Sequence, residues 1–172
     1  MYVVLLELVM GPTCSVAFEN EPADAEAMKK PPRKFTSTFF NTRELGDSLL
    51  AGLSVTAAVV FVYHSAVYSG YGADLTRTMV FTALVVSNIA LTFAGRASTD
   101  WLPMRGKRYN KIFTYIIAAT VVLLALLLVV PQLRLLLRFE AITWEQLLLC
   151  TLAACASVVL PGLLRIIARY LR

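Results

Sequence analysis

The chain has little charge and few of the side chains that catalyse hydrolysis. Charged residues make up 16% of its 172 residues, hydrophobic residues make up 58%, and the mean hydropathy is +0.69. This balance is too apolar for an ordinary soluble domain. One histidine is present, and no glycine-rich phosphate loop, pair of catalytic carboxylates or Ser-His-Asp set can be assembled. We therefore expect no catalytic activity from this chain alone, no bound cofactor, and a membrane as its solvent.

Signatures of metal-binding, nucleic-acid-binding and secreted proteins are also missing. Cys14, Cys150 and Cys155 lie in apolar segments without the spacing of a metal site or a disulfide framework, so buried thiols are expected. The net charge of +5 does not indicate a nucleic-acid partner, because the basic residues flank apolar runs instead of forming one patch interleaved with aromatic residues. The N-terminus lacks the basic region and the small-residue cleavage site of a signal peptide.

Long apolar runs are what the sequence does contain. A helix that crosses a membrane needs about 20 predominantly apolar residues. Five segments are suitable, namely residues 2–18, 49–69, 78–94, 112–130 and 147–164. The pattern predicts an all-α integral membrane protein with about five transmembrane helices, in which residues 1–172 form a single membrane domain.

The basic residues are concentrated on one side of these predicted spans. The loop of residues 19–48, the loop after the third span and the tail hold every Lys and Arg except Arg77, Arg134 and Arg138. Because Lys and Arg are retained in the cytoplasm, we expect these regions to be cytoplasmic, with the N-terminus outside and the C-terminus inside. A span that starts outside directly at Met1 is unusual, and we expect the chain to be cut from a larger membrane protein.

The first predicted span carries the strongest functional signal. It places Glu7 inside an apolar run and interrupts that run at Gly11-Pro12. A lone acid is costly in a bilayer unless it faces protein, water or an ion. Proline removes a backbone donor and leaves carbonyl oxygens free to face something polar. These features predict a helix broken at Gly11-Pro12 that contacts a cation.

Other polar positions leave alternatives open. Asn88, beside Ser87 in the third span, could hydrogen-bond a neighbouring helix or supply an oxygen ligand to a cation. His64, near two tyrosines, could be an interfacial histidine or could act in proton or metal binding. Residues 133–139 are short and amphipathic enough to lie at the membrane surface.

Residues 7–22 resemble a known transmembrane helix. They read ELVMGPTCSVAFENEP, which is similar to the E-L-I-I-D-P-T-C-S-I-V-F-E-x-E-P of the sixth transmembrane helix in bacterial P-type cation-transporting ATPases of the calcium-pump-like group. The resemblance continues after that helix and in the third span, at Met28, Pro31-Pro32-Arg33, Phe81, Thr82, Leu84, Val85 and Asn88. The five predicted spans suit helices six to ten of that family.

The resemblance implies a set of ion ligands. Glu7 falls on the ligand position of the sixth helix, and Asn88 lies close to the polar position of the eighth. Gly11 stands where the family has its aspartate. This difference removes a carboxylate from a site of low dielectric constant, and it should weaken cation binding by several kcal/mol.

The resemblance also implies a function in the inner cell membrane. The D-K-T-G-T phosphorylation motif is absent, so ATP and Mg²⁺ would bind only in domains that this sequence lacks. We expect this chain to be the C-terminal membrane domain of a cation-transporting ATPase. Its expected partners are the lipid bilayer and the remaining pump domains, which would belong to a separate chain. The alternative is a pump-derived membrane interaction or regulatory protein that transports nothing itself. An independent channel is disfavoured, because one carboxylate and one amide make a poor ion pathway.

Overall fold

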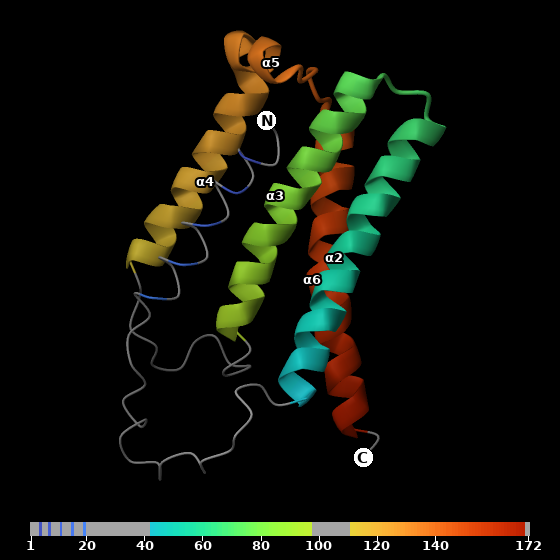
Figure 1. Cartoon of the computed structure of the whole chain (residues 1–172), viewed down its shortest axis with the longest axis vertical. Coiled ribbons are helices and arrows are strands. Elements are labelled where there is room, and N and C mark those ends of the chain that lie inside the picture. The colour runs from blue at the N-terminus through green and yellow to red at the C-terminus, as the bar shows by residue number, and fades with distance from the viewer. Residues whose placement is uncertain are drawn as a thin grey trace.

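The computed structural model describes residues 42–97 and 111–170, together with Val4, Glu7, Gly11, Ser15 and Glu19. Side chains are described for residues 45–94 and 112–162 and for those five residues. The two long ranges contain helices and no strand, which confirms the prediction of an all-α membrane protein. The helices are α2 (Thr42–Tyr68), α3 (Ala73–Ala97), α4 (Lys111–Val129), α5 (Pro131–Leu137) and α6 (Trp144–Tyr170) (Figure 1).

Four of these helices are long and apolar enough to cross a membrane. The spans within them are Leu45–Tyr68, Ala73–Ala94, Ile112–Val129 and Trp144–Gly162. They agree to within a few residues with the predicted spans at 49–69, 78–94, 112–130 and 147–164. α2 itself begins at Thr42, before the predicted span at 49–69 and within the predicted loop of residues 19–48. Hydropathy marks the part of a helix that lies in lipid, and it does not mark a polar turn that continues the same helix into water.

The first predicted span lies mostly outside the described residues. Val4, Glu7, Gly11, Ser15 and Glu19 have helical backbone conformations. Pro12 is not among the described residues, so the break at Gly11-Pro12 stays a prediction.

α3 is the central helix of the described part. In the part of α3 that could cross a membrane, 50% is buried inside the protein. The corresponding shares are 6% for α2, 17% for α4 and 28% for α6. α2 and α6 pack on one side of α3, while α4 and α5 lie on the other side (Figure 1). Two sides of α3 therefore contact protein, and the side chains of Ser87 and Asn88 in its middle are buried.

Two apolar cores flank α3. The first contains Val62, Ala66, Leu75, Met79, Ala83 and Cys150 from α2, α3 and α6. The second contains Phe81, Val85, Leu127, Leu137 and Phe139, with ring centroids 5.2 Å apart for Phe81 and Phe139. Because lipid tails are as apolar as these side chains, the helices are held by close packing more than by exclusion of water.

The turn between α4 and α6 is built by local backbone chemistry. Pro131 occupies the start of α5, where its missing N–H costs no helical hydrogen bond. Arg138 ends α5 with a left-handed backbone (φ 48°, ψ 45°), which reverses the chain direction. Thr143 and Gln146 then form a capping box: the Thr143 N–H donates to Gln146 Oε1 at 2.9 Å, and the Gln146 N–H donates to Thr143 Oγ1 at 3.5 Å. These features explain why α6 starts at Trp144.

The cysteines only partly follow the prediction of buried thiols. The Cys150 thiol is fully buried and donates to the Met79 carbonyl oxygen at 3.4 Å. Cys155 is free and exposed, so the prediction is wrong for this residue. The buried stripe of α6 passes through Cys150, Ala154 and Ser157, and position 155 lies outside that stripe. Cys14 is outside the described residues.

Candidate functional site

Buried polar side chains are concentrated along α3. Asn88 is 6% exposed, and Ser87 is fully buried beside it. Three buried threonines of α3, Thr78, Thr82 and Thr92, each donate a hydrogen bond to a carbonyl oxygen one turn earlier on the same helix. The bonds are Thr78 to Asp74 at 2.8 Å, Thr82 to Thr78 at 2.8 Å and Thr92 to Asn88 at 2.7 Å. These hydroxyl groups are satisfied locally, which is the usual way a threonine is accommodated within a helix in lipid.

Ser87 differs from the threonines. Its Oγ is buried and has no hydrogen-bond partner within the described structure. An unsatisfied buried hydroxyl costs about 1–3 kcal/mol, and such a group in a native protein commonly marks a bound water, an ion or stored strain. The sequence showed the Ser87-Asn88 pair but not its burial, since a helix that is apolar on most sides does not reveal which face is covered.

Ser87 and Asn88 lie on different sides of α3. Ser87 is one turn beyond Ala83, which packs in the first core toward α2 and α6. Asn88 is three residues beyond Val85, which packs in the second core toward α4 and α5. The pair therefore places an oxygen on each side of the central helix at one level.

Glu7 lies in a different environment. Its side chain is exposed, and so are those of Val4, Ser15 and Glu19. The spacing of three or four residues puts them on one face of the helix, together with Gly11. A Cβ added at Gly11 would meet nothing within 4 Å. A carboxylate in a bilayer requires protein, water or an ion beside it, and within the described residues this face of Glu7 is uncovered.

The structure thus places the two predicted ligands in different surroundings: Asn88 in the interior and Glu7 on the surface. Within the described ranges no group of three or more His, Cys, Asp and Glu side chains could hold a metal ion. His64 is exposed and belongs to no such group. The carboxylate of Glu7 and the amide and hydroxyl groups of Asn88 and Ser87 are oxygen donors of the class that hard cations prefer.

Comparisons with known proteins agree with this membrane architecture. A family described as "Cation transporting ATPase, C-terminus" matches residues 1–167. The chain is 22% identical over 172 residues to the calcium-transporting ATPase type 2C member 2 of Mus musculus, covering 99% of this chain and 18% of that protein. It is 24% identical over 148 residues to the calcium-transporting ATPase 1 of Yarrowia lipolytica. It is 20% identical over 148 residues to the calcium-transporting ATPase type 2C member 1 of Pongo abelii. Each of these two matches covers 86% of this chain and 16% of the relative. The chain therefore spans less than a fifth of the length of these relatives.

Proposed function

This chain belongs to the cation-transporting ATPases as a C-terminal membrane domain of the P-type family, and we propose that it supplies helices of the ion pathway to a pump. Phosphorylation and nucleotide binding would be carried out by the remaining pump domains in a separate chain, which would also bind ATP and Mg²⁺. The lipid bilayer surrounds the four described spans.

The burial of Asn88 in the central helix carries the proposal. This amide is held away from lipid on the most buried span, as expected for a polar group that serves an ion pathway. Glu7 supplies the carboxylate, and its exposed face would be covered by helices of the remaining pump domains. We propose Glu7 and Asn88 as ligands of the transported cation.

The proposed cation is calcium, because the relatives named above are calcium-transporting ATPases and because the donor set is made of oxygen atoms. Gly11 stands at the family's aspartate position, so we propose a lower calcium affinity than a site with that carboxylate would have. The bacterial inner membrane is the proposed location, supported by the resemblance of residues 7–22 to bacterial pumps. The distribution of Lys and Arg supports an N-terminus outside and a C-terminus in the cytoplasm.

A reconstitution experiment tests this function. Membranes would contain the full chain together with a second chain that carries the head domains and the first five helices of a pump. We expect calcium-dependent ATP hydrolysis that requires both chains and falls at least tenfold with Glu7→Gln or Asn88→Leu, since each 1.4 kcal/mol of lost stabilisation is a factor of ten. Glu145→Gln is the matched control, because Glu145 is an exposed acid at the start of α6.

Two outcomes would contradict the proposal. Full activity in both the Glu7 and Asn88 variants would remove them from the ion site. If the second chain hydrolyses ATP by itself and the present chain only raises or lowers that rate, a pump-derived regulatory protein would be favoured. The substitution of the family's aspartate by Gly11 is the feature that motivates this second function.

A further inference from the structure

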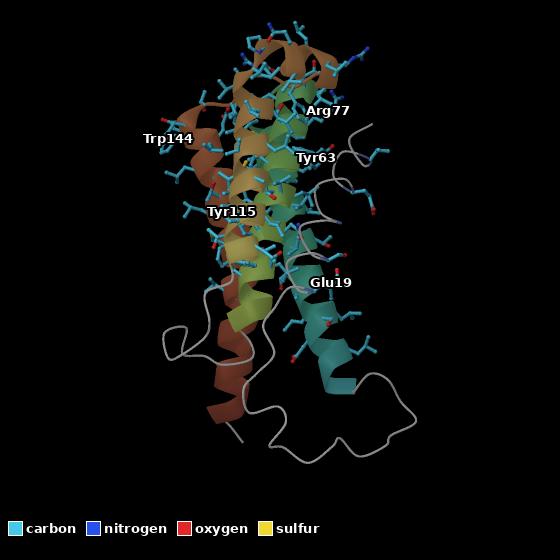
Figure 2. All side chains as sticks on the ribbon, turned by 90° about the vertical axis from the view of Figure 1, so that its left-hand side faces the viewer. Glu19, Tyr63, Arg77, Tyr115 and Trp144 are labelled. Atoms are coloured by element: carbon cyan, nitrogen blue, oxygen red, sulfur yellow. The ribbon has the colours of Figure 1, made fainter. Side chains whose placement is uncertain are left out.

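α5 lies at one end of the bundle, directly after the span of α4 (Figure 1). That span is 18 residues long, and at a rise of 1.5 Å per residue it extends about 27 Å. This length is close to the hydrocarbon thickness of a bilayer, about 30 Å. α5 therefore begins at the boundary between lipid tails and headgroups. Trp144 is at the same end as Arg77 (Figure 2) and is 75% exposed, as expected for an aromatic side chain in this region.

α5 has apolar side chains on two sides. Leu133 and Leu137 pack into the second core. Leu135 and Leu136 face outward and are 81% and 65% exposed. Two adjacent leucines exposed on so short a helix at this level fit contact with the upper part of the acyl chains better than contact with water.

The two arginines of this turn have unused hydrogen-bond donors. Among the described residues Arg134 and Arg138 form no ion pair, and the buried Nε of Arg134 has no hydrogen-bond partner. Arg77, at the same end, instead pairs with Asp74 at 2.6 Å and donates to the Arg138 carbonyl oxygen at 3.4 Å. A guanidinium group presents a planar fork of donors that matches the oxygens of a phosphate.

We propose that α5 is an interfacial anchor in which Arg134 and Arg138 bind the phosphate of a phospholipid headgroup while Leu135 and Leu136 enter its acyl region. The bound lipid fixes the turn that presses Phe139 onto Phe81 of the central helix. The anchor involves neither Glu7 nor Asn88, so this proposal can be tested independently of ion transport.

A tryptophan reporter tests the anchor. In the full chain, Leu135→Trp becomes the single tryptophan after Trp101→Phe and Trp144→Phe, and it sits at an exposed position between the two arginines. The protein is placed in phosphatidylcholine vesicles containing a small fixed fraction of either dibrominated phosphatidylglycerol or dibrominated phosphatidylcholine, whose bromine atoms quench fluorescence on contact. We expect the anionic lipid to quench about fivefold more effectively per molecule. Arg134→Gln combined with Arg138→Gln should bring this ratio to about one.

Three comparisons make the result specific. Arg134→Lys with Arg138→Lys keeps both charges and should retain a preference above that of the glutamine pair. Arg77→Gln removes one positive charge from the same end, and the ratio should survive because that charge is paired with Asp74. A loss with Arg77→Gln equal to that with the combined Arg134→Gln and Arg138→Gln change would show diffuse attraction and overturn the proposal. Abolition of the preference by added inorganic phosphate would also overturn it, by showing a site for a free anion. Circular dichroism confirms that each variant is folded.

Discussion

The backbone N–H of Glu140 donates a hydrogen bond of 3.0 Å to Oγ1 of Thr78. The same hydroxyl donates to the Asp74 carbonyl oxygen at 2.8 Å, and Thr78 is fully buried. One side chain of α3 thereby holds the segment that leaves α5, although the two residues are 62 positions apart. The connection between the two halves of the described bundle depends on this hydroxyl group as well as on the packing of Phe139.

Thr78→Val should destabilise the fold. Valine fills the same space but cannot accept a hydrogen bond, so the Glu140 N–H loses its partner, at a cost of about 1–3 kcal/mol. Thermal unfolding in detergent, followed by circular dichroism, measures the loss as a lower Tm. Thr56→Val is the matched control, because the Thr56 hydroxyl is exposed and only donates to the Gly52 carbonyl oxygen at 2.9 Å. Equal shifts in the two variants would show that the bond to Glu140 contributes nothing.

Ser87 and Ser157 should respond differently to replacement by alanine. Ser87→Ala removes a buried hydroxyl that has no partner in the described structure, and we expect stability to stay constant or to rise by about 1 kcal/mol. Ser157→Ala removes a buried hydroxyl that donates to the Ala154 carbonyl oxygen at 2.7 Å, and we expect a loss of about 0.5–1.5 kcal/mol. Denaturation of both variants in the same detergent tests this. A clear loss in Ser87→Ala would reveal a partner, such as a water molecule or an ion, that the hydroxyl binds in the native protein.

Close packing of α6 in the bundle should be sensitive to side-chain volume. Ala154 is fully buried on α6, and Ala83 of α3 is 1% exposed. Ala154→Leu should force the helices apart and destabilise the protein by about 1–3 kcal/mol. Ala156→Leu, at an exposed position on the same helix, should leave the Tm within a degree or two. We therefore expect the lower Tm for Ala154→Leu when both variants are measured in one detergent, and an unchanged Tm for Ala154→Leu would contradict close packing at this position.

The sequence alone could predict the described spans, because a run of apolar residues long enough to cross lipid is a local property. It could not predict that residues 42–48 extend α2, since a polar helical turn in water has no hydropathy signal. Nor could it predict that Asn88 is inside while Glu7 is exposed, because the covered face of an apolar helix is decided by neighbouring helices. The bond between Thr78 and Glu140 joins distant segments, and only the folded chain brings them together.

Gly11→Asp should strengthen binding of the transported cation. Gly11 is helical and one turn from Glu7, and a Cβ added there meets no atom within 4 Å. A second carboxylate on the face of Glu7 adds a negative charge in a medium of low dielectric constant, so we expect calcium affinity to rise at least tenfold, or about 1.4 kcal/mol. The calcium dependence of ATP hydrolysis, measured in membranes that contain this chain with the remaining pump domains, gives the change in affinity.

Gly11→Asn is the control for that experiment, since asparagine has nearly the same size and no charge. If the gain comes from charge, Gly11→Asn should change the affinity little, and Glu7→Gln in the Gly11→Asp background should reverse most of the gain, because the two carboxylates would hold the same ion. Equal affinities for the aspartate and asparagine variants would place the cation away from this face. In that case the exposed carboxylate of Glu7 would need another role, and Asn88 would have to bind the ion from the interior of the bundle without it.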